Sequence, residues 1–382
     1  MKNIILSLIA VALLLGGPFS LVAVPQTSLA DLYKTGKIRL EQKLLITDDN
    51  LPDEMFFEYA SGVTSDNGGN IYVVDYRAHH IKKFDPSGKF LKLLGGEGEG
   101  PGEFIGPYRI TFAKDKLFVY ELDKRRLNTV DTDGKFIHSV SMEIMEGSLR
   151  GMRAFPNGNI FVRKEKSYLW NEARPQNCML HIFSSTLESL NKIYEHEIVR
   201  NKYITEPVRT NVPQPFFANV CWDIAPNGQV VIGYADKYEI SLHDPEKGKL
   251  FSFSHKFKPV KVTSKDKEDW FGQMTYSRGG EIFEGAQEFV KKNTNFPKNK
   301  PPYHDIKVDP EGNILVFTNT QDEVFNFTSF DAFDPKGNFI NHVEVVGNNQ
   351  FQKNMPRLGQ YFAAISTNEE GLYQVSLYTI SK

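Results

Sequence analysis

A turn motif that returns every 40 to 50 residues or so constrains the fold of this chain more than any other feature. In each copy a turn rich in Asp, Asn, Pro and Gly precedes a short apolar run, and a second such turn follows further on. The first turns of the copies lie at 66–69, 156–158, 226–228, 309–312 and 369–371, and the second turns at 85–90, 131–136, 244–245 and 334–339. Gly, Asn and Asp belong in these turns because hairpins need positive φ or a capping side chain. Each copy therefore predicts four short antiparallel strands.

Six units of four strands predict an all-β fold, a six-bladed β-propeller. The composition agrees, since 29 Phe and 16 Tyr favour strands, while 29 Gly and 20 Pro favour tight turns. A chain of 382 residues, 40% of them hydrophobic, is also long enough for one large array with a continuous core.

The two ends of the chain indicate how the ring closes. Residues 43–46 and 52–56 align with residues 92–95 and 101–104, so the N-terminal segment resembles an outer strand without a blade of its own. The last unit, 361–382, is too short and lacks an outer strand. We expect the two to pair, because closure removes sheet edges that would otherwise invite aggregation.

The blade linker resembles that of a known family. Residues 95–104 read Gly-Gly-Glu-Gly-Glu-Gly-Pro-Gly-Glu-Phe and are followed by Pro107; with Asp75 and Ile81 they resemble NHL-repeat propellers, whose blades are joined by a G-x-G-x-G-P-G-x-F linker. The resemblance is close in the first two blades, weaker in the fourth to sixth, and covers residues 37–382. It implies an exported bacterial six-bladed propeller. The family includes interaction platforms and, in relatives, metal-dependent lyases and lactonases, so it implies a fold more than an activity.

The N-terminus predicts export. Lys2 precedes an apolar run over residues 4–15 and then Gly16, Gly17 and Pro18, which is typical of a signal peptide spanning residues 1–23. A second candidate cleavage site follows Ala30. The alternative is an uncleaved membrane anchor, but the Gly-Gly-Pro break disfavours a spanning helix. We therefore expect a periplasmic or secreted protein with no membrane contact after cleavage.

Charge and cysteine content exclude other classes. With 45 Lys and Arg against 47 Asp and Glu, the net charge is −2, so the chain lacks the basic surplus of a nucleic-acid binder. Two cysteines exclude both a disulfide-stapled scaffold and a multi-cysteine metal site. Cys178 and Cys221 could pair in an oxidising compartment, but two buried thiols are the favoured reading.

Three long insertions, at 163–177, 200–218 and 261–302, fall on one face of the predicted ring. Strands alternate in direction, so the loops between second and third strands emerge beside the connections between blades. The longest insertion, between the fourth and fifth blades, has apolar residues at helical spacing near 270–274 and 282–290. It predicts either a lid over the central funnel or a cover for exposed blade edges.

Arginine and aromatic side chains dominate the predicted mouth of that funnel. The expected ligand-binding residues are Tyr108, Arg109, Arg150, Trp222, Tyr303, His304 and Tyr361 at the starts of inner strands, and Arg77 in a loop. Arginine offers paired donors to carboxylate or phosphate, and aromatic faces stack on sugars or planar groups. Basic loop residues also occur in propellers as a solvated rim, which is the alternative for Arg77.

Catalytic motifs are absent from the sequence: it has no G-x-S-x-G elbow, no Walker A loop and no C-x-x-C pair. We therefore predict a monomeric binding module that takes a protein or a small anionic or sugar-like ligand, without a cofactor. The alternative is a lactonase-like hydrolase or lyase with a divalent cation such as calcium in the channel. Its candidate ligands are Asn219, Asp223 and Asp305; His304 alone would not make a three-histidine zinc site.

Overall fold

A computed structural model describes most of the chain: residues 27–141, 147–166, 176–186, 188–199, 201–204, 210–272, 277–278, 281–282, 286–318 and 326–382. The signal peptide expected at residues 1–23 lies outside the described residues. Over the described ranges, no helix is both long and apolar enough to cross a bilayer.

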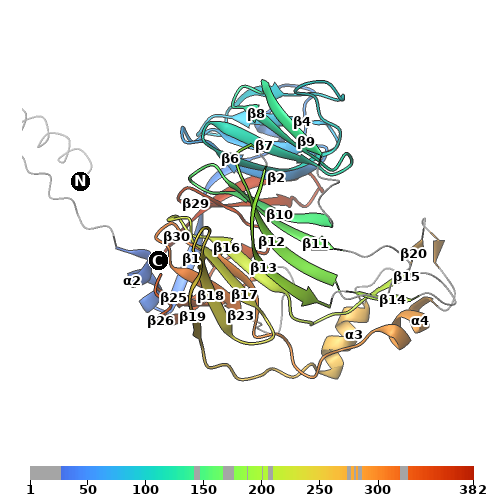
Figure 1. Cartoon of the computed structure of the whole chain (residues 1–382), viewed down its shortest axis with the longest axis vertical. Coiled ribbons are helices and arrows are strands. Elements are labelled where there is room, and N and C mark those ends of the chain that lie inside the picture. Colours follow the sequence, from blue (N-terminus) through green and yellow to red (C-terminus); the bar gives the residue numbers. More distant parts are fainter. Residues whose placement is uncertain are drawn as a thin grey trace, which may run out of the picture.

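Five blades of four antiparallel strands follow one another along the chain; the first four are separate sheets, and the fifth continues into the sixth (Figure 1). The first two are β2 (Ala60–Ser65), β3 (Ile71–Asp75), β4 (His80–Phe84) and β5 (Phe90–Leu94), then β6 (Pro107–Ala113), β7 (Lys116–Glu121), β8 (Arg126–Asp131) and β9 (Phe136–Ser141). The third is β10 (Ser148–Ala154), β11 (Ile160–Lys166), β12 (Gln176–Phe183) and β13 (Ser189–Ile198). The fourth is β16 (Val220–Ile224), β17 (Val230–Tyr234), β18 (Glu239–Asp244) and β19 (Gly248–Ser254). The fifth is β22 (Tyr303–Val308), β23 (Ile314–Thr318), β25 (Ser329–Phe333) and β26 (Phe339–Val345).

The sixth blade is built from both ends of the chain, as the sequence predicts. Its strands are β28 (Arg357–Leu358), β29 (Tyr361–Thr367), β30 (Tyr373–Ser381) and β1 (Lys37–Ile46), in that order from the channel outward. β1 pairs antiparallel with β30 from Arg39 opposite Ser381 to Ile46 opposite Val375. It also meets β26 in parallel over two residues, which joins the sixth blade to the fifth. The ring is closed, and the fold is a six-bladed β-propeller.

The outer position of β1 is confirmed by a contact that other blades repeat. In the second blade, Gly134 has φ 89° in the turn between third and fourth strands and lies against Leu94, on the outer strand of the first blade. In the first blade, Gly88 has φ 86° in the same turn and lies against Leu44 of β1. Leu44 therefore occupies the position in the sixth blade that Leu94 occupies in the first.

Two details of the last unit differ from the expectation. The turn at 369–371 joins β29 to β30, so it follows the second strand of the blade and not the first. Tyr361 starts the second strand of the sixth blade, because the short strand β28 takes the innermost position and pairs with residues 361 and 362. The sequence shows no repeat signal for β28, since only two residues form it. Tyr361 consequently lies at the opposite end of the ring from the predicted mouth.

The apolar core lies between the blades. Among the described residues, the buried apolar side chains form six clusters, one at each boundary between neighbouring blades. The cluster at the closing boundary joins Ile46 of β1 to Phe57, Val73 and Val375. A large apolar side chain contributes about 1.5–3 kcal/mol when it is fully buried, so each boundary stabilises the whole ring.

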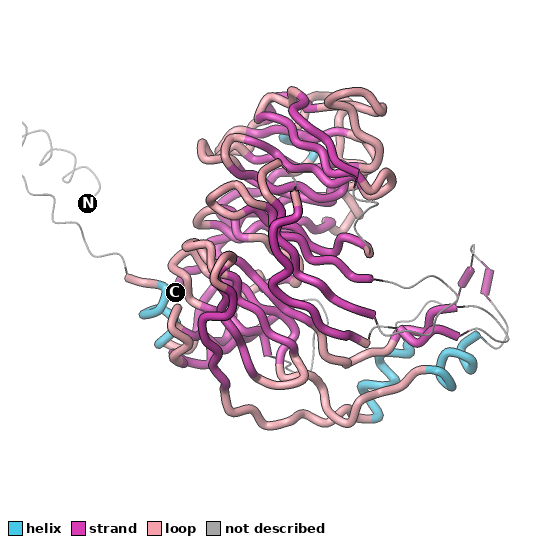
Figure 2. Tube along the Cα trace, viewed as in Figure 1, coloured by secondary structure: helices cyan, strands magenta, loops and turns pink. Residues whose placement is uncertain are grey.

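The inserted segments stand to one side of the ring (Figures 1 and 2). They comprise β14 (Asn201–Ile204), β15 (Thr210–Pro213), α3 (Ser264–Gly272), β20 (Ser277–Arg278), β21 (Glu281–Ile282) and α4 (Ala286–Asn293). The other short elements are α2 (Leu29–Lys34), the 3₁₀ turn Asp48–Asn50, β24 (Asn326–Phe327) and β27 (Phe351–Gln352). The predicted partly helical insertion between the fourth and fifth blades is thereby confirmed.

Candidate functional site

The central channel widens at one end into a cavity of about 390 Å³, which we call the upper cavity. Its walls come from the ends of the inner strands where β2, β6, β10, β16 and β22 begin, and from residues 352–356 before β28. Such a volume is typical of small-molecule pockets. This is the end of the ring at which the sequence predicts a funnel.

A repeated irregularity of the inner strands shapes this cavity. In four of them the pairing register slips by one residue close to the start, as in a β-bulge: between Ala60 and Gly62, Pro107 and Arg109, Leu149 and Gly151, and Tyr303 and Asp305. The residues left between are Ser61, Tyr108, Arg150 and His304. A bulge re-aims the side chains around it, and Ser61, Tyr108 and Arg150 all line the upper cavity.

Four arginines gather around the cavity. Arg109, Arg150, Arg153 and Arg163 all line it. Burial lowers the pKa of Arg109, and the positive charges of Arg153, Arg150 and Arg163 lower it further. The Arg109 Nε is buried without a hydrogen-bond partner in the described part of the chain. A guanidinium has five N–H donors, and burying one of them without an acceptor costs free energy. A bound anion would accept hydrogen bonds from Arg109 and offset this cost.

The carboxylates near these arginines are already engaged. Glu165 accepts a 2.6 Å hydrogen bond from Arg163 and lies 3.3 Å from the Nε of Arg150. Both oxygens of Asp223 accept backbone amides, from Ile224 and Val308. Asp305 accepts from the Ile306 amide and from Lys307. The cavity thus presents an excess of positive charge and of unused N–H donors.

Aromatic rings line the same cavity. The Arg109 guanidinium lies 5.3 Å from the centre of the Tyr108 ring, and Arg153 lies 5.9 Å from the Trp222 ring. Tyr59 and Tyr373 also line the cavity, with ring centres 5.3 Å apart. The aromatic faces can stack on a planar or sugar-like body while the arginines hold its acidic group.

The structure brings five of the eight predicted residues to the upper cavity or its rim. Tyr108, Arg109, Arg150 and Trp222 line the cavity. Trp222 also packs between blades, with its ring 4.5 Å from Phe161. Arg77 is exposed and lies 5.7 Å from the ring of Tyr59, so it stands at the rim rather than in the wall.

The other three predicted residues lie elsewhere. Tyr303 starts an inner strand but is fully buried between the fourth and fifth blades, where its hydroxyl donates to the Glu239 carbonyl at 3.3 Å. His304 is not among the lining residues, and its ring lies 6.5 Å from that of Phe327. Tyr361 lies at the opposite end, in a groove between the sixth and first blades. Being at the start of a strand does not decide which way a side chain points.

The sequence analysis missed several cavity residues, chiefly Arg153, Lys307, Lys353 and Tyr373. Arg153 and Lys307 lie two residues beyond the register slip of their strands, on the side of the strand that faces the channel. Side chains alternate between the two faces of a strand, so this alternation could have located Arg153 and Lys307 if the position of the register slip had been known. Lys353 precedes a strand with no repeat signal.

The candidate calcium ligands of this part of the ring already accept hydrogen bonds. Within the described ranges, no group of three or more His, Cys, Asp or Glu side chains could hold a metal ion. Asn219, the third calcium candidate, accepts hydrogen bonds from Arg163 and from the Val220 amide. Because Arg153 and Lys307 also line the cavity, a cation there would meet like charges. Cys178 and Cys221 are both buried thiols, as expected.

The insertion at 261–302 does not cover the upper cavity with any of its described residues. It packs instead on the β14–β15 hairpin side, where Gln214 donates to the Asn293 carbonyl and accepts from the Asn295 amide. Phe296 packs there against Trp270 and Phe271. Residues 167–175 and 205–209 of the other insertions lie outside the described residues.

Comparison with known proteins supports the fold. Residues 51–211 match the family model DUF5128, described as a 6-bladed beta-propeller. A solved structure of a DUF4221 family member from Bacteroides vulgatus is 13% identical, with 91% of this chain and 99% of that chain covered and a TM-score of 0.51. At that identity the likeness shows the fold alone.

Two further structures are weaker matches. A Bacteroides fragilis protein inferred to be exported is 12% identical, with 90% and 96% of the two chains covered and a TM-score of 0.48. Regucalcin, a calcium-binding protein from Agrobacterium tumefaciens, is 11% identical, with 90% and 96% covered and a TM-score of 0.42. No curated protein sequence matches the chain.

Proposed function

We propose that the chain is an exported, NHL-like propeller module that binds a small organic anion in the upper cavity. The half-buried Arg109 carries this proposal, because it lies beside three other arginines and its buried Nε has no partner in the described chain. Export rests on the apolar stretch at residues 4–15, and the NHL likeness on the linker at residues 95–104.

The anion's acidic group would lie between Arg109 and Arg150. Arg150 stands at the edge of the cavity, since its side chain is 51% exposed and is held near Glu165. Arg150 can therefore contact an entering ligand while the ligand is still solvated, and Arg109 lies deeper in the cavity wall. A planar guanidinium pairs with carboxylate or phosphate through two parallel bonds, which favours these groups over chloride.

The body of the ligand would lie against Tyr59, Tyr108 and Trp222. These rings line the cavity from the first, second and fourth blades, and such aromatic faces suit a uronic acid, another acidic sugar or an aromatic acid.

The experiment is a calorimetric titration of the protein with acidic sugars, dicarboxylates and acidic peptides, each beside its neutral amide. A charge-assisted hydrogen bond contributes roughly 1.5–3 kcal/mol, so Arg109→Ala should weaken binding by about ten-fold or more. Arg109→Lys should restore it only in part, because an ammonium lacks the planar fork.

Arg39→Ala is the matched control, since Arg39 is exposed on β1 and lines neither end of the channel. Equal binding of every acid by Arg109→Ala, Arg39→Ala and the unaltered protein would refute the proposal. A requirement for added calcium, abolished by chelation, would instead support the metal-dependent hydrolase or lyase.

A further inference from the structure

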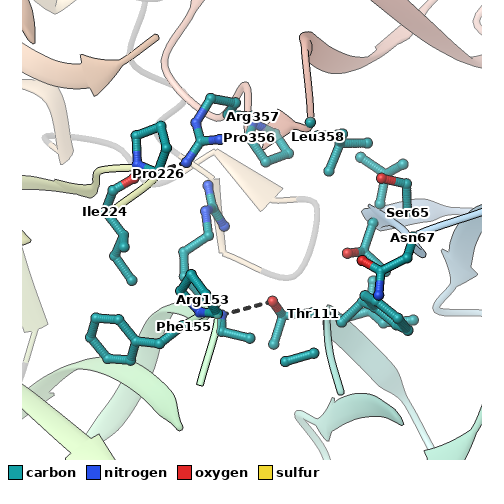
Figure 3. Close-up of a pocket in the computed structure, with 18 of the residues that line it drawn as sticks. Ser65, Asn67, Thr111, Arg153, Phe155, Ile224, Pro226, Pro356, Arg357 and Leu358 are labelled. Atoms are coloured by element: carbon teal, nitrogen blue, oxygen red, sulfur yellow. Dashed lines mark hydrogen bonds between the residues drawn. The ribbon is translucent and has the colours of Figure 1, made fainter. Parts of the chain in front are cut away.

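The channel has a second cavity at its other end, with a volume of about 470 Å³, which we call the lower cavity (Figure 3). It lies where the inner strands end and is lined by the turns that follow them. Ile110, Arg153 and Asp223 line both cavities, so the two spaces meet in the middle of the ring. The lower cavity belongs to the face opposite the proposed ligand site.

Two arginines project into the lower cavity from opposite walls, as Figure 3 shows. Arg153 comes from β10, and its hydrogen bond within the described chain goes to the Met152 carbonyl at 3.0 Å. Arg357 comes from β28, and it donates to the Ile224 carbonyl at 3.2 Å. The Nε of Arg357 is buried without a partner in the described residues. Most N–H donors of both guanidiniums therefore remain available to a ligand.

The other lining residues favour an anion of more than a few atoms. Three cationic side chains, Arg153, Arg357 and Lys114, face one carboxylate, Asp223, whose oxygens already accept two backbone amides. Burial lowers the pKa of Arg153. The negative charges of Asp223 and Asp305 raise it in part, and the positive charge of Arg357 lowers it further. The remaining wall is mixed: Pro156, Pro226, Pro356, Phe155 and Leu358 form its apolar part, and the polar Thr64, Ser65, Asn67 and Thr111 also line it.

We infer that the lower cavity is a second anion site, which binds a small organic acid with its carboxylate or phosphate between Arg153 and Arg357. The proline-lined wall holds the body of the acid, and Ser65 and Asn67 at the mouth supply further polar groups. A single phosphate would fill only part of this volume, since cavities of this size accept small organic molecules. The site opens at the opposite face from the upper cavity and shares Arg153 with it, but it needs neither Arg109 nor Arg150.

The arrangement predicts a particular pattern among variants. Arg357→Met should weaken only the lower site, and Arg109→Met only the upper one. Arg153→Met should weaken both, because Arg153 lines both cavities. Arg39→Met should change neither. This pattern separates failure of the lower site from failure of the proposed function.

The test is calorimetric titration of the whole protein with succinate and with inorganic phosphate; succinamide serves as the neutral control. We expect two anions to bind per chain. Arg357→Met should lower the affinity of one site about ten-fold or more, and the affinity of Arg357→Lys should lie between those of Arg357→Met and the unaltered protein. The tighter of the two probes identifies the acidic group. Unchanged binding of both probes by Arg357→Met, or binding of succinamide as tight as succinate, overturns the inference.

A crystal of the unaltered protein soaked in selenate decides the matter if Arg357→Met does not fold. An anomalous peak between the guanidiniums of Arg153 and Arg357 supports the inference. Selenate found only beside Arg109 and Arg150 overturns it and leaves the upper site standing.

Discussion

The first two blades and the boundary between the fifth and sixth blades, which we call the closing side, are stabilised by different interactions. In the first blade the second strand ends on Asp75, which is fully buried, accepts the Glu58 and Tyr59 amides at 2.9 Å and pairs with Lys82 at 2.6 Å. Glu121 does the same in the second blade, with the Ile105 amide and Arg126. At the closing side, the aromatic rings of Tyr33, Phe317, Phe330, Phe351 and Phe362 pack against one another.

The difference shows which contacts need a fixed direction. Asp75 holds the chain as it enters β2, and so it fixes Tyr59 at the wall of the upper cavity. Apolar packing has no such direction, and it can be completed by a segment far away in sequence. The closing side therefore accepts the N-terminal strand, whereas the first two blades orient the starts of the strands that form the candidate site.

Removal of the N-terminal segment should have the largest effect and should fall on the closing side. Deletion of residues up to Ile46 removes four fully or nearly fully buried side chains, Tyr33, Ile38, Leu40 and Ile46. At about 1.5–3 kcal/mol each, the loss of roughly 6–12 kcal/mol matches the whole stability of an ordinary domain. Thermal melting should show no cooperative transition. A chain beginning at Ser28 is the control, and equal melting of the two chains would contradict the prediction.

Loss of the Asp75 carboxylate should be the next largest effect and should fall on the first blade. Asp75→Ala leaves the buried Lys82 ammonium beside the His80 Nε2 but without its carboxylate, and it removes the acceptor of three backbone amides. Breaking a buried ion pair from one side costs about 3–5 kcal/mol. Denaturant unfolding measures this cost. Asp53→Ala, at an exposed position, is the control, and a similar small loss for both variants would show that the buried pair contributes little.

Acid should distinguish the two regions, because the pKa values of their buried carboxyls move in opposite directions. Burial raises the pKa of Asp75, but Lys82 and the amides of Tyr59 and Glu58 bring the net pKa below the usual 3.8. Its contribution is present above pH 3.8 and is lost as the pH falls through the lowered value. Burial of Asp309, which accepts from Tyr33 at 2.8 Å, raises its pKa despite the hydrogen bonds from Asn313 and Tyr33. That contribution is present below pH 3.8 and is lost as the pH rises through the raised value.

Hydrogen exchange measured region by region at pH 3 and pH 6 tests this contrast. Lowering the pH should lower the opening free energy of residues 58–84 more than that of residues 29–46. The difference should be on the order of 1 kcal/mol for each unit by which the pKa is shifted. Equal losses in the two regions would show that Asp75 and Asp309 do not set their pH dependence.

Tyr303→Phe should have the smallest effect. The variant keeps the buried ring and removes one hydrogen bond of 3.3 Å to the Glu239 carbonyl, so we expect a loss of about 1 kcal/mol or less in unfolding free energy. Anion binding should stay unchanged, because Tyr303 does not line the upper cavity. A ten-fold loss of anion affinity in Tyr303→Phe would contradict this prediction and would show that Tyr303 contributes to binding.

The sequence located the blades because their signals are local. Asp85, Asp131 and Asp334 each accept the amides two and four residues onward, so the tight turn is encoded within five residues. The alignment of residues 43–46 with 92–95 likewise identified the closing strand. It matches Leu44 with Leu93, however, whereas the contacts of Gly88 and Gly134 match Leu44 with Leu94, so the register was one residue off. The short strand β28 carries no such signal, and Arg357 was therefore missed.

The candidate site divides in the same way. The sequence determined that arginines and aromatics stand near the starts of the inner strands. Only the tertiary structure decided that Arg109 faces the channel while Tyr303, also at the start of an inner strand, lies between two blades. The physical reason is the register slip in four inner strands: a shift of one residue exchanges the faces of a strand, and it depends on pairing with a neighbouring strand rather than on local sequence.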